Sequence, residues 1–171
     1  SSNVSVGAQA LENNTTASEN TAVGYQALKD NTTGDGNTAI GVKAMDANTV
    51  GDRNVAVGAD ALGAMNPSSN TDMYNTAVGY QAGLNVSTGT ENTLIGGLAG
   101  AANTTGSYNT SVGASSLDAN TTGGRNSALG REALTKNTTG SLNTGLGYEA
   151  LKENTTASSN TAVGYQAGVS N

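Results

Sequence analysis

The sequence predicts an all-β protein folded as a parallel β-solenoid, or β-roll, of about ten 17-residue coils. The first observation is a repeat with asparagine at its first position and glycine at its fifth in every copy. Such a fixed period indicates units that bury their apolar faces by stacking on their neighbours. The unit is also too short for the helix pairs of common α-repeats, whose periods run from about 33 to 47 residues. Finally, with 24 glycines and no phenylalanine or tryptophan, the chain lacks the bulky residues of a compact core.

The whole chain, residues 1–171, forms one repeat array. The copies, numbered here as coils one to ten, begin at Asn3, Asn20, Asn37, Asn54, Asn75, Asn92, Asn109, Asn126, Asn143 and Asn160. Coil four, residues 54–74, is irregular because it has 21 residues, and it holds the only proline, Pro67. No capping repeat is apparent at either end, so we expect a segment of a longer fibre or coils that stack end to end between chains.

Each coil is expected to contain two short strands and two turns. Positions one to four alternate in a strand-like way, with a β-branched or aliphatic residue at positions two and four in nearly every coil. Both positions fall on one face of a strand, which we expect to face the core. Positions six to nine predict a second strand that ends in alanine and leucine. The Asn-Thr-Thr-Gly run at positions twelve to fifteen is typical of a turn.

The glycine at position five is expected to be structural, because it permits a bend or a close backbone approach that a side chain would block. These glycines are Gly7, Gly24, Gly41, Gly58, Gly79, Gly96, Gly113, Gly130, Gly147 and Gly164. Ten coils that advance by about 4.8 Å each predict a rod on the order of 45 to 50 Å long.

Three runs resemble a known class of surface proteins. Residues 4–10 read VSVGAQA, and residues 21–27 and 161–167 both read TAVGYQA. These runs are similar to the head repeats of trimeric autotransporter adhesins and to repeats of phage-type tail-fibre and bacterial surface-fibre proteins. The resemblance implies a left-handed β-roll, assembled as a homotrimer, that serves as an adhesive head or fibre outside the cell.

Composition argues against an enzyme and against several classes of partner. The chain has no histidine and no cysteine, so it lacks the usual general base, thiolate nucleophile and soft metal ligands. Its 13 carboxylates fall at varied coil positions, so we expect no catalytic residues, no metal and no cofactor. A net charge of −6 with seven basic residues argues against nucleic acid. No apolar run approaches the roughly 20 residues of a membrane span.

Asparagine at position twelve allows two interpretations. It begins a glycosylation sequon at Asn14, Asn31, Asn103, Asn120, Asn137 and Asn154. Asparagines stacked from coil to coil can instead form hydrogen-bonded amide ladders. We favour the ladder, because asparagine also recurs at position one, where most coils lack a sequon.

The expected function is that of a non-enzymatic structural or adhesive fibre segment that projects or stiffens an extracellular appendage. Its expected partners are sister chains, as a homotrimer or an end-to-end filament, together with host-cell or surface glycans. The alternative is an ice-binding solenoid that uses repeated rows of threonine and asparagine. A candidate recognition loop lies in coil four, where we expect the methionines and the proline to lie outside the core. Its residues are Met65, Asn66, Pro67, Asp72 and Tyr74.

Overall fold

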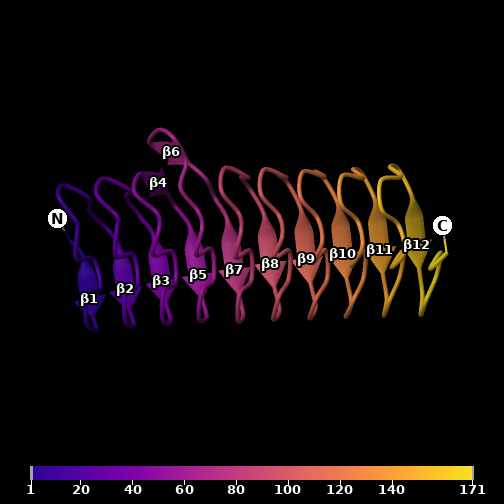
Figure 1. Ribbon diagram of the computed structural model, residues 1–171, viewed down its shortest axis with the longest axis horizontal. Coiled ribbons are helices and arrows are strands. Elements are labelled where there is room, and N and C mark those ends of the chain that lie inside the picture. The colour runs from indigo at the N-terminus through magenta and orange to yellow at the C-terminus, as the bar shows by residue number, and fades with distance from the viewer. Residues whose placement is uncertain (1, 171) are drawn as a thin grey trace.

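The computed structural model describes residues 2–170 as an all-β parallel solenoid of about nine turns. Figure 1 shows the coils side by side in a straight row, with the two ends of the chain at opposite ends of the rod. The main sheet has ten parallel strands in the order β1-β2-β3-β5-β7-β8-β9-β10-β11-β12. The predicted fold class is therefore confirmed.

Each coil contributes one three-residue strand at positions two to four. These strands are β1 (Val4–Val6), β2 (Thr21–Val23), β3 (Thr38–Ile40), β5 (Val55–Val57), β7 (Thr76–Val78), β8 (Thr93–Ile95), β9 (Thr110–Val112), β10 (Ser127–Leu129), β11 (Thr144–Leu146) and β12 (Thr161–Val163). Equivalent residues pair throughout, so Thr21 lies opposite Thr38 and Val23 opposite Ile40. The register also holds across the long coil four, because Thr76 of β7 pairs with Val55 of β5.

The second strand predicted at positions six to nine does not form. Two successive turns occupy this stretch. In the first, the N–H of position eight donates to the carbonyl of position five, and in the second, the N–H of position twelve donates to the carbonyl of position nine. Non-glycine residues at positions seven and nine have positive φ, for example 59° at Gln26 and 49° at Leu28. This left-handed conformation curls the backbone and is incompatible with an extended strand.

The prediction that positions two and four face the core is wrong. Position three is buried in coils two to ten, whereas position four is exposed or half-buried in every coil. Ala39, for example, is 0% exposed, and the neighbouring Ile40 is 40% exposed. In seven of the ten coils the inside is filled by the small residues at positions three and eight and by the leucine or methionine at position nine. That space admits alanine from the strand but not a second row of large side chains.

Two columns of buried asparagine amides hold the coils together. At position one, Asn109 accepts a hydrogen bond from the backbone N–H of Asn126 at 3.0 Å, and its own amide donates to the Gly123 carbonyl at 2.9 Å. At position twelve, the Asn120 amide donates to Asn103 Oδ1 at 2.9 Å. The ladder interpretation of these asparagines is thus supported by hydrogen bonds both within and between coils.

We expect Asn109→Ala to lower the free energy of unfolding by about 3 kcal/mol. The change leaves the N–H of Asn126 buried without its acceptor, and an orphaned buried polar group costs about 1 to 3 kcal/mol, to which the lost amide bonds add. Urea denaturation of this variant beside Thr105→Ala, at an exposed position fourteen, measures the difference. Equal denaturation midpoints for the two variants would contradict the claim that the asparagine ladder stabilises the fold.

The prediction that the methionines and the proline of coil four lie outside the core is wrong, although the coil stacks on its neighbours in register. Met65 and Met73 are 0% and 1% exposed and belong to the main hydrophobic cluster, and Pro67 is also buried. Met65 occupies position twelve, where it replaces a ladder asparagine with apolar volume. The projecting part of the coil includes β6 (Thr71–Asp72), which pairs in parallel with β4 (Gly51–Asp52) and stands out from the row in Figure 1.

Candidate interaction surface

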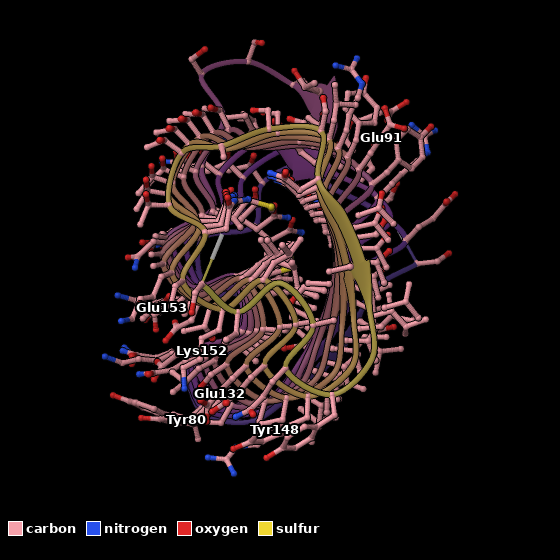
Figure 2. The ribbon with its side chains drawn as sticks, turned by 90° about the vertical axis from the view of Figure 1, so that its right-hand side faces the viewer. Tyr80, Glu91, Glu132, Tyr148, Lys152 and Glu153 are labelled. Atoms are coloured by element: carbon pink, nitrogen blue, oxygen red, sulfur yellow. The ribbon has the colours of Figure 1, made fainter. Side chains whose placement is uncertain are left out.

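The outer face of the sheet is formed by the side chains at positions two and four of all ten coils. Position two holds threonine, serine or valine, and position four holds valine, isoleucine or leucine, so none of these twenty residues is charged. The short strands place both rows outward because neighbouring residues of a strand point to opposite sides and position three points inward. In Figure 2, which looks along the rod, the strands form one side of the cross-section and carry this face.

Two further rows border the outer face. The first corner row is the last residue of each coil, which is position seventeen in every coil except the longer coil four and lies directly before the asparagine of the next coil. The second corner row is position six, directly after the structural glycine. Figure 2 shows Glu91 of the first corner row at one end of the strand and Tyr148 of the second corner row at the other. Non-glycine residues of the first corner row have positive φ, such as 58° at Arg53, which turns their side chains outward before each strand.

Every large hydrophobic residue that is exposed in residues 2–170 lies on the outer face or its two corner rows. Their exposed fractions run from 36% for Val55 to 74% for Tyr165. The full set is Val4, Val6, Tyr25, Ile40, Val42, Val55, Tyr74, Tyr80, Ile95, Tyr108, Leu129, Leu142, Leu146, Val163 and Tyr165. A concentration of this kind on one side of a protein marks an interaction surface.

The hydroxyl groups of position two differ from those of position thirteen. At position thirteen, Thr104 Oγ1 donates to the Thr121 carbonyl at 3.0 Å, and the same bond recurs in other coils. At position two, the eight threonine and serine hydroxyls make no side-chain hydrogen bond to any residue that the structure describes. They are therefore available to water or to a partner.

The first corner row carries four charged residues, and the second corner row carries one, Arg131. Along the rod it reads Glu19, Gly36, Arg53, Tyr74, Glu91, Tyr108, Arg125, Leu142 and Ser159. Arginine lies beside tyrosine in this row: Arg125 is 5.2 Å from the ring centre of Tyr108, and Arg53 is 6.0 Å from that of Tyr74. Arg53 also forms an ion pair with Asp72.

The structural glycines at position five lie where the backbone of one coil closely approaches the backbone of the next. Their φ angles run from +128° to +140°, a region that side-chain-bearing residues rarely adopt. In the first nine coils a Cβ atom would lie 2.3 to 2.6 Å from the carbonyl oxygen of the next coil's glycine. Both the backbone conformation and the lack of space thus require glycine at position five.

The sequon asparagines occupy the amide ladder. Asn31, Asn103, Asn120, Asn137 and Asn154 are at most 1% exposed, and Asn14 is half-buried. Their amide nitrogens donate to backbone carbonyls at position fifteen, or at Asn14 to the equivalent Ala17 at 3.4 Å. A glycan on any of the five buried amides would require its coil to open, so the folded rod does not present them as accessible sites.

The loop residues predicted in coil four do not act as one exposed group. Asn66, Asp72 and Tyr74 are exposed, whereas Met65 and Pro67 are buried. Tyr74 Oη donates to Asp72 Oδ2 at 3.0 Å. Asp72 pairs in register with Asp52, which in turn accepts the N–H of Asp35 at 2.7 Å. Aspartates of three consecutive coils are therefore stacked on one another. This stack was not predicted from the sequence, in which the carboxylates fall at varied coil positions.

A charged cluster lies on the flank away from the sheet, where Figure 2 shows Glu132 and Lys152. Lys152 Nζ donates to Glu132 Oε2 and to Glu149 Oε1, each at 2.7 Å, and Gln166 Nε2 donates to Glu149 Oε2 at 2.7 Å. The hydrogen bond from Lys152, followed by that from Gln166, lowers the pKa of Glu149 from 4.5 to about 2. The bonds to Glu132 and Glu149 raise the pKa of Lys152.

We expect Glu149→Gln to reduce the acid sensitivity of the fold. Because the pKa of Glu149 is lower in the folded chain, its contribution to stability is present above about pH 4.5 and is lost as the pH falls towards 2. The difference in unfolding free energy between parent and variant should shrink over this range in urea titrations. Burial raises the pKa values of Asp46 and Asp118, but both groups are present in parent and variant. Their contributions to the pH dependence therefore cancel in the difference. A difference that stays constant with pH would contradict the assignment.

Among residues 2–170 there is no group of three or more histidine, cysteine, aspartate or glutamate side chains that could hold a metal ion. The same residues include no helix long and apolar enough to cross a membrane. No protein-family profile, curated protein or solved structure matches this chain. Fold and surface together identify it as a repeat protein of the parallel β-solenoid class with one apolar face.

Proposed function

We propose that this chain is a non-enzymatic, rigid segment of an extracellular structural or adhesive fibre, and that it assembles with sister chains through the outer face. The observation that carries the proposal is the location of all exposed large hydrophobic residues of the described chain on that face and its corner rows. Two uncharged rows, in which all side chains except Ser127 carry a methyl group, leave water at little cost when they meet a similar surface.

The regular stacking supports a mechanical role. Nine steps of about 4.8 Å give a rod of about 45 Å. Amide ladders, glycine contacts and parallel strand pairing link every coil to the next. Such a rod transmits force along its axis and holds whatever is attached at its ends at a set separation.

The size of the outer face also supports assembly. Including the corner rows it is roughly 20 Å wide and about 45 Å long, and therefore covers about 900 Å². Stable protein interfaces bury about 800 Å² on each partner. A face of this extent is sufficient for a specific interface between copies of the chain.

The test is sedimentation of the parent chain and of Ile95→Lys at micromolar concentration. Ile95 lies near the middle of the outer face and is 38% exposed, so a lysine there places a charge inside the interface without filling the core. We expect the parent to associate and the variant to sediment as a folded monomer. Thr105→Lys, which adds the same charge at an exposed position fourteen, should associate like the parent.

Two outcomes would overturn this proposal. A parent chain that remains a well-folded monomer at these concentrations would remove the basis for assembly. Equal association of the parent and Ile95→Lys would show that the chains meet through another surface.

Ice binding is the second candidate function, because eight coils each present one position-two hydroxyl on the outer face that makes no side-chain hydrogen bond to any described residue. The adjacent threonines at positions thirteen and fourteen are not the relevant pair, since those at position thirteen bond to the next coil. Thermal hysteresis produced by a folded monomer, and lost in Ile95→Lys, would favour ice binding over assembly.

A further inference from the structure

We infer that the outer face pairs with the same face of a second chain that runs in the opposite direction, related by a two-fold axis along strand β7. This inference rests on the proposed assembly through the outer face and goes further by assigning its orientation. It is carried by the order of residues in the two corner rows, which the sheet brings to opposite borders of the same face.

Charges in the first corner row alternate in sign every second coil. Glu19, Arg53, Glu91 and Arg125 occupy this row at intervals of about 10 Å, and all four are exposed. Tyr74 lies at the centre of the series, with Arg53 and Glu91 on its two sides. Outside them lie Gly36 and Tyr108, and then Glu19 and Arg125.

Reversal about Tyr74 makes this row complementary to itself. A two-fold axis along the strand direction places the first corner row of one chain against the same row of the other, with the order of coils reversed. Arg53 then faces Glu91 of the second chain, and Glu19 faces its Arg125. Gly36 leaves room for the second Tyr108, and the two Tyr74 side chains meet at the axis. All four charges of each chain gain a partner of opposite sign.

The second corner row is compatible with the same axis. Position six of coil five lies on the axis, and Ala59 lies opposite Gly97. Tyr25 lies opposite Arg131, a pairing of ring and guanidinium that already occurs within the chain between Arg131 and Tyr148 at 5.8 Å. No like charges meet in either row.

A parallel arrangement fits these rows poorly. Any axis along the rod, two-fold or three-fold, sets the first corner row of one chain against the second corner row of its neighbour at the same level. Glu91 would then face Gly97, and Arg125 would face Arg131 of the next chain. None of the four charges in the first corner row would gain an opposite charge there, because three would face uncharged residues and Arg125 would face another arginine.

An antiparallel pair also covers nearly all of the apolar surface. The axis along β7 stacks β5 on β8, β3 on β9, β2 on β10 and β1 on β11 of the second chain, which leaves only β12 uncovered. Because the sheets are stacked with their strands aligned, this is a usual packing for two sheets. Rods that project from two facing surfaces would meet in this orientation.

Cysteine cross-linking tests the orientation directly, because the natural chain contains no cysteine. Thr38→Cys lies on β3 and Thr110→Cys on β9, both outside the charged rows. We expect a short bismaleimide to link Thr38→Cys to Thr110→Cys when the two variants are mixed, and to link neither to itself. Thr76→Cys, on the axis, should link to itself in either orientation and reports whether the faces meet at all.

Each outcome is decisive. Self-linking of Thr38→Cys and of Thr110→Cys would establish parallel chains, as in the homotrimer that the family resemblance implies, and would overturn the inference while leaving the proposed assembly in place. No linking of Thr76→Cys would contradict the proposed assembly itself.

Charge reversal gives a second, independent reading. In the antiparallel pair Arg125→Glu turns two favourable contacts with Glu19 into repulsions, so we expect the dissociation constant to rise about tenfold at low salt. Adding Glu19→Arg to the same chain should restore the parent value. In parallel chains Arg125→Glu would relieve the contact with Arg131 and tighten association, which would overturn the inference. Circular dichroism confirms that each surface variant is folded.

Discussion

Gly79→Val is expected to lower the melting temperature of the rod by roughly 10 °C or more. Gly79 has a φ of +138°, and a Cβ atom there would lie 2.6 Å from both the carbonyl carbon and the carbonyl oxygen of Gly96 in the next coil. Backbone strain and overpacking each cost about 1 to 3 kcal/mol, so their sum is on the order of 4 kcal/mol. For a chain of this size, 1 kcal/mol corresponds to about 2 to 4 °C.

Gly97→Val is the matched control for this prediction. Gly97 is at position six of the adjacent coil, and nothing lies within 4 Å of the site where its Cβ would be. Position six also carries valine at Val42 in coil three. We expect its melting temperature to be unchanged, measured at a concentration where both proteins are in the same state of association. A Gly79→Val variant as stable as Gly97→Val would show that adjacent coils separate without cost.

Leu94→Ala is expected to lower the free energy of unfolding by about 3 to 5 kcal/mol. Leu94 is the only leucine at position three, and coils five and six are the neighbouring pair in which glycine replaces leucine at position nine. A Cβ atom on Gly83 or on Gly100 would lie 2.8 Å from a methyl group of Leu94. One leucine therefore fills the space that two leucines fill in the other coils, and its loss leaves an unusually large cavity.

Restoring the common pattern should rescue this variant. Gly100→Leu alone should destabilise the chain, because the new side chain would collide with Leu94. Combined with Leu94→Ala, it recreates the alanine and leucine of the regular coils, and the left-handed backbone at position nine accepts leucine elsewhere, as at Leu117 with a φ of 50°. Chemical denaturation of the two single variants and the double variant should give strongly non-additive changes. Additive losses would show that the three residues do not share one space.

The repeat period and the glycines were enough to predict the architecture. A unit of 17 residues with turn chemistry between short apolar stretches can bury those stretches only by stacking, which is a local argument that needs no knowledge of the fold. The close approach at position five also follows from residue type, because glycine recurs there in all ten coils while its neighbours vary. The amide ladders followed from the same reasoning about stacked equivalents.

One further signal was present in the sequence but was not recognised. Positions seven, nine and seventeen adopt left-handed backbone throughout the described chain, and none of the 25 non-glycine residues with positive φ is β-branched. In a chain rich in threonine and valine, the consistent lack of these residues at three positions indicates a conformation that a β-branched side chain resists. That pattern would have excluded a second strand at positions six to nine.

The period, the glycine column and the stacked asparagines were thus determined by the sequence, whereas the side of the strand that faces inward was decided only by the tertiary structure. Alternation identifies the two faces of a strand but does not say which face is buried. In this chain the buried face is the one that carries the smaller residues. The reason is volume: leucine at position nine reaches across a narrow coil and leaves space only for alanine, so the larger aliphatics of position four lie outside. In coil six, where position nine is glycine, position three enlarges to Leu94 and the same space is filled from the other side.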